Sequence, residues 1–293
     1  IDEVIIGNVA QPAHAANVAR VIALRAGIPK HVPAVTVHRN CASGMESITT
    51  GIQRLLLGEA NCILAGGVES MSNIPLLFQK KMSTWLAQFS RAKSPLQKIK
   101  LLSRCRPSFF KPVIALMLGL TDPVCNQLMG MTAENLAKEF SISRNEQDQF
   151  ALESHQKATK AIESGYLAEE IVPIPLPPRY NQILSEDNGP RRNQSIEALN
   201  KLKPFFDRRH GTVTVGSSSQ VTDGAAAVIL MTESKAKSLE LSPLGYIRDY
   251  AYAGCDPHRM GLGPSYATAK VLERTGLSMA HFDRIELNEA FAA

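Results

Sequence analysis

The sequence contains few cysteines, and their spacing excludes the structural roles that cysteine clusters usually serve. Of its 293 residues only five are cysteine, at positions 41, 62, 105, 125 and 255. No two of them form a CxxC pair, and none has histidines at zinc-binding spacing, so we expect no structural metal. The odd number and the absence of a dense cysteine framework argue against a disulfide scaffold and favour a reducing compartment.

Long hydrophobic runs are also absent. The longest apolar stretch, residues 112–120, is too short to cross a bilayer. No signal peptide opens the sequence, which begins at Ile1 without a methionine, and this start suggests a fragment or a processed product. Hydrophobic residues make up 44% and charged residues 20% of the chain, an ordinary composition for a globular protein with a substantial core.

Acidic residues are missing from one long segment. Residues 78–120 contain nine lysines and arginines and no aspartate or glutamate, whereas the net charge of the whole chain is +5. Apolar and aromatic side chains, including the only tryptophan, Trp85, are interleaved with the basic ones, as is typical of an interfacial amphipathic helix or helical hairpin. Three roles stay open: contact with an anionic membrane, docking to a partner protein, or an ordinary solvated helix. No nucleic-acid-binding module accompanies the segment, so we expect no nucleic-acid partner.

The hydrophobic pattern near the N-terminus predicts an α/β fold. Apolar and β-branched segments predict strands at 4–9, 34–38 and 62–65, the last closed by the glycine pair 66–67. Apolar residues spaced one helical turn apart predict helices at 15–26 and between residues 41 and 58. Strand, helix, strand, helix and strand in succession favour a mainly parallel sheet.

The pattern changes after residue 77. Beyond the basic segment, residues 121–206 predict helix followed by proline-rich loops. A strand pair is then predicted at 211–215 and 226–232, a further strand at 242–251, a helix at 266–275 and a last strand at 284–287. The α/β pattern is thus interrupted by a long insertion and then resumes.

Cys41 lies between a predicted strand and a predicted helix. A strand-to-helix turn exposes a side chain at the carboxyl end of a sheet, where ligands commonly bind. The positive end of a helix favours the thiolate, which is the nucleophilic form of cysteine. Ser43 and Gly44 suit a tight turn whose backbone N–H groups can hold an oxyanion. Position alone leaves open a buried structural thiol, because buried cysteine is common.

Six short motifs, read in order, decide between these alternatives. They are Cys41-Ala42-Ser43-Gly44, Gly66-Gly67-Val68-Glu69-Ser70-Met71-Ser72, Gly130-Met131-Thr132-Ala133-Glu134-Asn135, Gly211-Thr212-Val213-Thr214, Asp223-Gly224-Ala225-Ala226-Ala227 and Asn288-Glu289-Ala290-Phe291-Ala292. Together they closely resemble the thiolase family, over residues 3–293. The stretch 203–214 and the basic segment are most similar to the degradative 3-ketoacyl-CoA thiolases, including the β-subunit of trifunctional β-oxidation complexes.

The resemblance implies a thiolase fold, layered α-β-α-β-α from two similar halves with an inserted loop domain. It places the N-terminal half at 1–77 and 207–241, and the inserted loop domain at 78–206, with the basic amphipathic segment at 78–120. The start of the C-terminal half falls at 242–293. By the same comparison, the family's first strand and most of its second half are missing from residues 1–293.

The resemblance also implies an acyltransferase that cleaves 3-ketoacyl-CoA with CoA, giving acetyl-CoA and a shortened acyl-CoA. Cys41 matches the nucleophile, and its backbone N–H would contribute to one oxyanion site. Asn288 matches the residue that holds a water in the other oxyanion site. Positions matching the acyl and CoA pocket are Met129, Ser219, Phe291 and either Arg191 or Arg192, whereas His38, His155 and His210 have no matched catalytic role. No metal or cofactor is implied, since CoA is a substrate.

Two departures from the family affect these expectations. Ser217 stands where the family usually has asparagine, which changes hydrogen bonds near the site. The family's catalytic histidine and its second, acid/base cysteine have no match among residues 1–293. We therefore expect the complete gene product to be a thiolase and the chain as written to be inactive.

Two other functions remain open from the sequence. One is an acetoacetyl-CoA thiolase of biosynthetic type, and the other is a non-catalytic, thiolase-like lipid-binding or scaffold protein. The family implies a homodimer or tetramer. The hydratase/dehydrogenase subunit of a β-oxidation complex is a further expected partner. The expected location is the bacterial cytoplasm or the mitochondrial matrix, with membrane contact through residues 78–120.

Overall fold

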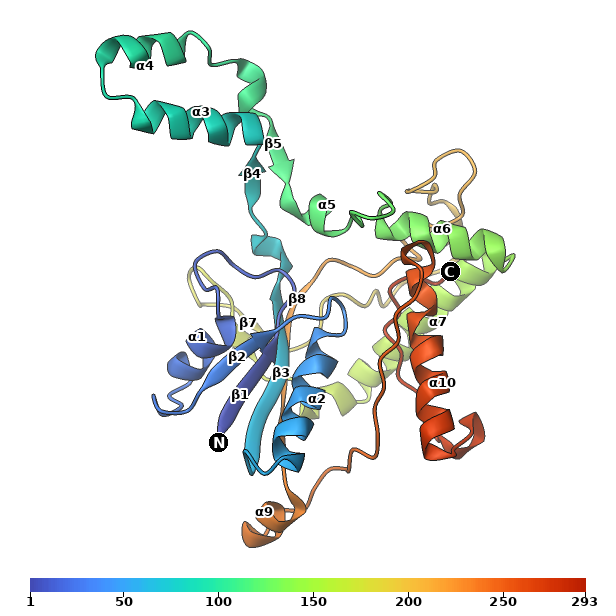
Figure 1. Cartoon of the computed structure of the whole chain (residues 1–293). Helices are drawn as coiled ribbons and strands as arrows, with labels where there is room; N and C mark the ends of the chain where they lie inside the picture. The colour runs from blue at the N-terminus through green and yellow to red at the C-terminus, as the bar shows by residue number, and fades with distance from the viewer. The chain divides into compact units, whose positions relative to one another are not determined.

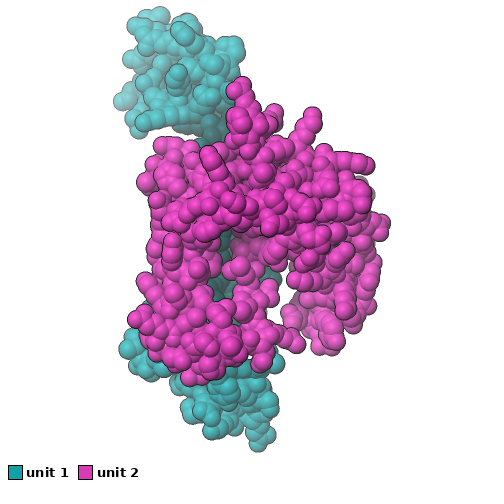
Figure 2. Space-filling view, turned by 90° about the vertical axis from the view of Figure 1, so that its right-hand side faces the viewer, with its two compact units in different colours: residues 1–120, 222–247 teal, residues 121–221, 248–293 magenta.

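The computed structural model describes all residues, 1–293, and they form two compact units. Unit 1 comprises residues 1–120 and 222–247, and unit 2 comprises residues 121–221 and 248–293 (Figure 2). Each unit is therefore assembled from two stretches of chain that are distant in sequence.

A four-stranded sheet in the order β2-β1-β3-β8 forms the centre of unit 1 (Figure 1). Its strands are β1 (Glu3–Gly7), β2 (Ala34–Val37), β3 (Cys62–Ser70) and β8 (Asp223–Met231). The first three run parallel, as predicted, whereas β8 is antiparallel to β3, so the sheet is mixed. Parallel neighbours require crossover connections, and the predicted helices supply them as α1 (Val18–Arg25) and α2 (Ser43–Leu56).

The alternating side chains of β1 explain why helices cover both faces of this sheet. Val4 and Ile6 point to one face, where they are buried with Ala19 of α1. Ile5 points to the other face, where it is buried with Ile63, and Leu55 of α2 packs against them. Because successive side chains of a strand alternate in direction, one short apolar strand contributes to two cores.

Strand β3 is longer than predicted, because its two glycines belong to the ladder. Gly66 and Gly67 pair with β1 on one side and with Ala227 and Ala226 of β8 on the other. A Cβ atom on Gly66 would lie 2.3 Å from the carbonyl oxygen of Ala226. Glycine therefore permits close approach of two backbones here instead of ending the strand.

The basic segment folds as a helical hairpin, one of the two forms that the sequence predicts. Its elements are β4 (Leu76–Phe78), α3 (Lys80–Arg91), α4 (Pro95–Leu102), the 3₁₀ turn η2 (Pro107–Phe110), β5 (Pro112–Ile114) and α5 (Ala115–Gly119). Helices α3 and α4 lie side by side beyond the short antiparallel β4–β5 ladder (Figure 1). Ser94 and Gln97 form a capping box that starts α4. No helix of the chain combines the length and apolar character that crossing a bilayer requires.

Helices and hydrogen-bonded loops dominate unit 2. Its elements are α6 (Met129–Glu139), α7 (Arg144–Glu163), η3 (Tyr166–Glu169), β6 (Ile174–Pro175), β7 (Ile183–Leu184), α8 (Ile196–Asn200), η4 (Pro257–Leu262), α10 (Gly263–Thr275) and η5 (Met279–His281). Two short elements complete unit 1, namely η1 (Met71–Asn73) and α9 (Glu233–Ser238). The predicted helix at 266–275 is confirmed as part of α10. The predicted strands at 211–215, 242–251 and 284–287 are wrong, because these segments pair with no other strand.

Candidate functional site

Cys41 lies at the turn between β2 and α2, and its side chain is exposed. Ser43 holds this turn: its hydroxyl accepts the N–H of Arg39 at 2.9 Å and donates to the carbonyl of Asn40 at 2.6 Å. Asn40 has a left-handed backbone, with a φ of 47°. The sharp reversal presents the thiol just before the first turn of α2, as the sequence predicts.

Glycines allow the start of α2 to approach the sheet closely. A Cβ on Gly7, the last residue of β1, would lie 2.3 Å from the carbonyl carbon and oxygen of Ser43. A Cβ on Gly67 would lie 3.5 Å from the Cα of Gly44. The N-terminus of α2 is thus held against the carboxyl end of β1, where a side chain at Gly7 would displace it, whereas a Cβ at Gly67 would make only an ordinary van der Waals contact.

The loop that carries Asn288 belongs to unit 2 and is held by residues 217–219. The N–H of Ser219 donates to the carbonyl of Ala290, and the N–H of Ala292 donates to the carbonyl of Ser217, both at 2.9 Å. Between them, Ser218 forms a single β-bridge with Phe291. Ser219 and Phe291, assigned to the same pocket, therefore do lie on adjacent segments.

An aromatic cluster brings Met129 towards the same loop. Phe206 packs edge-to-face on Phe291, with ring centroids 5.9 Å apart. Gly130, which follows Met129 at the start of α6, lies so close to Phe206 that a Cβ there would be 2.2 Å from its ring. The first turn of α6 and the Asn288 loop thus both contact the ring of Phe206.

A buried carboxylate anchors the segment that precedes Ser217. Both oxygens of Glu134 on α6 accept the N–H of Thr212, and one also accepts the N–H of Val213 at 2.9 Å. Ser217 is buried and accepts the N–H of Thr214 at 3.0 Å through its hydroxyl. The backbone donors of 212–214 therefore bind side chains and not a neighbouring strand, which explains why the predicted strand is not formed.

The structure separates the two arginine candidates. The guanidinium of Arg192 pairs with Glu186: its Nη2 donates to both carboxylate oxygens at 3.0 Å. The guanidinium of Arg191 has no ion pair, but its backbone N–H donates to Nδ1 of His155 at 3.2 Å. Burial lowers the pKa of His155, and the charge of Arg191 lowers it further, which favours the neutral imidazole that this bond needs. Arg191 is therefore the better placed of the two to meet an anion.

Two adjacent residues of α7 contact segments of unit 2 that carry candidate residues, and the sequence assigned no role to either. His155 binds the Arg191 segment, and the hydroxyl of Ser154 donates to the Glu289 carboxylate at 2.5 Å. The available signal was positional: Ser154 follows buried Gln147 and Ala151 at helical spacing and so continues the inward face of α7. A polar residue on such a face needs a partner.

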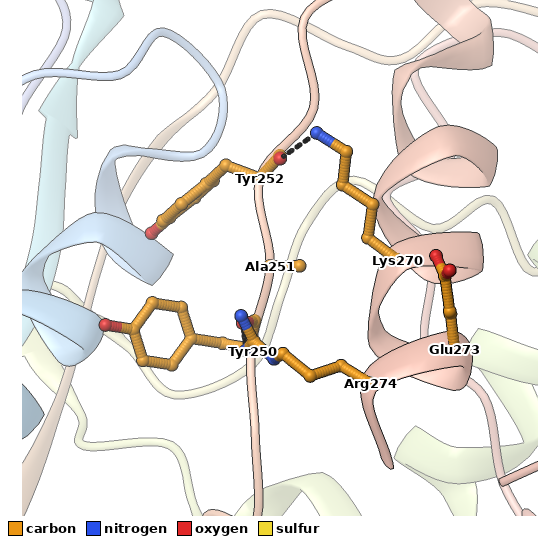
Figure 3. Close-up of a pocket in the computed structure, with 6 residues that line it drawn as sticks. All are labelled: Tyr250, Ala251, Tyr252, Lys270, Glu273 and Arg274. Carbon is orange, nitrogen blue, oxygen red and sulfur yellow. Dashed lines mark hydrogen bonds between the residues drawn. The ribbon is translucent and has the colours of Figure 1, made fainter. Parts of the chain in front are cut away.

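A hollow of about 640 Å³ lies elsewhere in unit 2 (Figure 3). It is lined by Tyr250, Ala251, Tyr252, Lys270, Glu273 and Arg274. Lys270 donates to the carbonyl of Tyr252 at 3.2 Å, and Arg274 pairs with Asp249. Its cations thus serve to hold residues 249–252 against α10, and the hollow contains none of the candidate residues.

Family models match nearly the whole sequence. Residues 1–234 match the thiolase N-terminal domain and residues 241–293 match the thiolase C-terminal domain. The chain belongs to the thiolase family. The 3-ketoacyl-CoA thiolase of Escherichia coli O157:H7 is 42% identical over 294 residues, which span all of this chain and 66% of that protein. The enzyme of the same name from Pectobacterium atrosepticum is 41% identical with the same coverage. This thiolase chain therefore spans just under two thirds of the length of these relatives.

Solved thiolase structures share its fold. Bacillus anthracis acetyl-CoA acetyltransferase is 40% identical with a TM-score of 0.87, covering 100% of this chain and 69% of its own. Human mitochondrial 3-ketoacyl-CoA thiolase in complex with CoA is 38% identical with a TM-score of 0.85, covering 100% and 68%. The thiolase fold is thus confirmed. Cys41 belongs to unit 1, whereas the other candidate residues, Met129, Arg191, Ser219, Asn288 and Phe291, belong to unit 2.

Proposed function

We propose that this protein is a 3-ketoacyl-CoA thiolase of fatty acid β-oxidation. It would cleave 3-ketoacyl-CoA with CoA, giving acetyl-CoA and a shortened acyl-CoA. The observation that carries the proposal is the exposed thiol of Cys41 at the strand-to-helix turn, within a chain of the thiolase family. The names of the relatives from E. coli and P. atrosepticum support this substrate class.

The proposed reaction divides one carbon–carbon cleavage into two steps. The Cys41 thiolate attacks the 3-keto carbon, and the bond between C2 and C3 breaks. Its electron pair forms the enolate of acetyl-CoA, whose oxygen is stabilised by a water held on Asn288, while the acyl group stays on Cys41 as a thioester. The enolate takes up a proton, which we assign to no residue among 1–293. The thiolate of free CoA then attacks the thioester and releases Cys41 and the shortened acyl-CoA.

Substrate binding is assigned to unit 2. Met129, Ser219 and Phe291 would line the pantetheine arm and acyl group, and Arg191 would bind a CoA phosphate. The human relative in complex with CoA supports CoA as the ligand. The segments that carry Ser219 and Phe291 are joined by backbone hydrogen bonds between Ser219 and Ala290 and between Ala292 and Ser217, and this rigidity suits a surface that must align a flexible thioester.

Thiolysis assays on the protein expressed from its complete gene test this function. Wild type should cleave 3-ketohexadecanoyl-CoA in the presence of CoA, and mass spectrometry should find an acyl adduct on the Cys41 peptide. Cys41→Ala should abolish both signals, whereas the matched variant Cys62→Ala in β3 should keep them. If the wild type showed no turnover and no adduct, the enzyme assignment would be rejected and a lipid-binding or scaffold role would be favoured.

The same assay decides a second candidate, an acetoacetyl-CoA thiolase of biosynthetic type. The similarity to B. anthracis acetyl-CoA acetyltransferase favours this alternative. Turnover of acetoacetyl-CoA without turnover of the long-chain substrate would select it. Turnover of both would leave the degradative assignment in place.

The hairpin supports a further part of the proposal, peripheral contact with an anionic membrane. Trp85 faces inward: its indole N–H donates to the carbonyl of Leu101 at 2.8 Å, and its ring stacks on Phe89. The outer face of α4 instead exposes three apolar side chains, Leu96 (77%), Ile99 (63%) and Leu102 (52%). They accompany nine basic residues, each of which contributes up to about 1 kcal/mol near an anionic surface.

Vesicle co-sedimentation tests this contact. The double variant Leu96→Ser/Ile99→Ser should lose binding to vesicles rich in anionic lipid, while Leu57→Ser, which alters an equally exposed leucine (71%) of unit 1, should bind as wild type does. Unchanged vesicle binding by the double variant would reject membrane contact through α4. Loss of binding to a hydratase/dehydrogenase subunit instead would favour the hairpin as a docking surface for that partner.

Assembly, location and domain boundaries complete the proposal. We propose a homo-oligomer in the bacterial cytoplasm or the mitochondrial matrix, since relatives come from both bacteria and human mitochondria. The proposed domains are the N-terminal half at 1–77 and 207–241, the inserted loop domain at 78–206 and the start of the C-terminal half at 242–293. The gap between the two family-model matches, residues 235–240, lies beside the proposed boundary at 241 and supports it.

A further inference from the structure

One side-chain hydrogen bond connects the middle of α7 to the Asn288 loop. The hydroxyl of Ser154 donates to Oε2 of Glu289 at 2.5 Å, across a separation of 135 residues. Ser154 is half-buried on a 20-residue helix with a capping box, so the donor has a fixed origin. Its acceptor belongs to the residue directly after Asn288.

The other hydrogen bonds that hold this loop are made by residues that follow Asn288 in the sequence. Backbone bonds to Ser217 and Ser219 hold positions 290 and 292, and the Ala290 N–H returns to the Asn288 carbonyl at 3.0 Å. The preceding residues 283–287 make no hydrogen bond and follow an irregular path. The Ser154–Glu289 bond is therefore the contact that restrains the loop nearest to Asn288 from outside the loop.

We propose that Ser154 is a positioning residue that holds Asn288 through Glu289. The inference rests on the proposed function, in which Asn288 holds the water that stabilises the enolate. A hydrogen bond to a carboxylate is directional and strong for its size. Without the hydroxyl, the exposed Glu289 carboxylate would turn to solvent, and the backbone at Asn288 would gain freedom. A small displacement of an oxyanion-binding group is enough to slow a reaction by about tenfold to a hundredfold.

The two half-reactions distinguish positioning from a general structural role. Asn288 acts where the enolate forms, which is the carbon–carbon cleavage step. The exchange of an acyl group between acyl-CoA and free CoA through Cys41 forms no enolate. Ser154→Ala should therefore lower kcat for thiolysis about tenfold and leave acyl exchange within about twofold of wild type. KM for the ketoacyl substrate should change little.

Conservative and matched variants complete the design. Ser154→Thr keeps a hydroxyl and should restore most of the thiolysis rate. Ser164→Ala, at the end of α7, removes a hydroxyl that contacts only the Ala161 carbonyl of its own helix and should change neither reaction. If Ser154→Ala lost thiolysis and acyl exchange equally, or lost neither, the proposal would be overturned.

Hydrogen exchange gives a second readout that does not require activity. Peptides covering 283–292 should exchange faster in Ser154→Ala than in wild type, while the β1–β3 peptides of unit 1 should not change. Unaltered exchange of 283–292 would overturn the positioning role. A wild type that shows neither thiolysis nor acyl exchange would overturn the proposed function instead. Hydrogen exchange of the amides of residues 283–292 would still decide whether Ser154 holds the loop.

Discussion

Replacing Glu134 by alanine should destabilise unit 2, because its buried carboxylate binds the backbone of residues 212–213. The side chain is 9% exposed, and it accepts the N–H groups of Thr212 and Val213. Val213 is fully buried, so water cannot replace the lost acceptor there without opening the loop. Thr212 is only partly buried, and its N–H regains a water partner more easily.

The size of the effect follows from these two donors. A hydrogen bond to a charged group contributes about 1.5–3 kcal/mol, and a buried donor left unpaired costs a similar amount. One buried and one partly buried donor together give an expected loss of about 3 kcal/mol in the free energy of unfolding. A glutamine keeps one carbonyl oxygen as acceptor, so Glu134→Gln should lose roughly half as much.

Urea unfolding followed by circular dichroism measures this loss. The only tryptophan, Trp85, lies in the hairpin of unit 1, so its fluorescence reports the hairpin and provides a comparison outside unit 2. Glu163→Ala, an exposed glutamate at the end of α7, serves as the matched control and should unfold as wild type does. A Glu134→Ala midpoint within the error of wild type would refute the reasoning, because it would mean that the loop satisfies both donors without the carboxylate.

Two further predictions concern unit 1. Hydrogen bonds from the Ser72 hydroxyl and N–H lower the pKa of Asp223 below 3.8, so this group stabilises the fold above its unfolded pKa and loses that effect as pH falls through the lower folded value. Asp223→Asn should therefore be less stable than wild type at pH 7, and the difference in urea midpoint should shrink below about pH 4. A difference that stays constant between these pH values would contradict a dependence of stability on the protonation of Asp223. Trp85→Phe removes the indole bond to Leu101 at a cost of about 1 kcal/mol, so amides of α3 and α4 should exchange faster while β1–β3 amides stay unchanged; uniform acceleration would show that the hairpin does not open independently.

The N-terminal elements were predictable because each carries its own pattern. β1 places Val4 and Ile6 on one face and Ile5 on the other, and this alternation is visible in the letters. The helix after Cys41 was predictable from apolar residues at helical spacing. The extension of β3 through Gly66 and Gly67 was not, since glycine marks a turn as often as a close approach, and only β8, which begins at Asp223, distinguishes them.

The failed strands show what composition omits. Residues 242–251 and 284–287 have β-forming side chains, but a strand is stabilised by its neighbour, and no ladder of this chain includes either segment. Tyr246, Ile285 and Leu287 are exposed as a result. The strand predicted at 211–215 is not formed for a different reason: the backbone N–H groups of Thr212 and Val213 donate to the buried carboxylate of Glu134 and not to a neighbouring strand.

The candidate site divides in the same way. The exposure of Cys41 at a strand-to-helix turn was predictable from the local pattern, whereas its role as nucleophile, like the positions in unit 2, came from resemblance to thiolases. Their assigned roles stay predictions. Ser154 and His155 were missed because their partners, Glu289 and Arg191, lie 135 and 36 residues away. Helical spacing marks Ser154 as inward-facing but does not name what it meets.

The Cys41 turn of unit 1 and the Asn288 loop of unit 2 are therefore held by different interactions, so substitutions should affect them differently. Cys41 is presented by apolar packing under the sheet and by glycines that let α2 approach it, so enlarging Gly7 or emptying the core around Ile5 should displace the nucleophile. The Asn288 loop is held by two backbone hydrogen bonds and one β-bridge to residues 217–219 and by the Ser154 side chain, while Glu134 fixes the preceding residues 212–213. Loss of one such contact has no neighbouring ladder to compensate for it. Conservative polar substitutions should accordingly impair the Asn288 loop even at positions where secondary-structure propensity predicts no loss of stability.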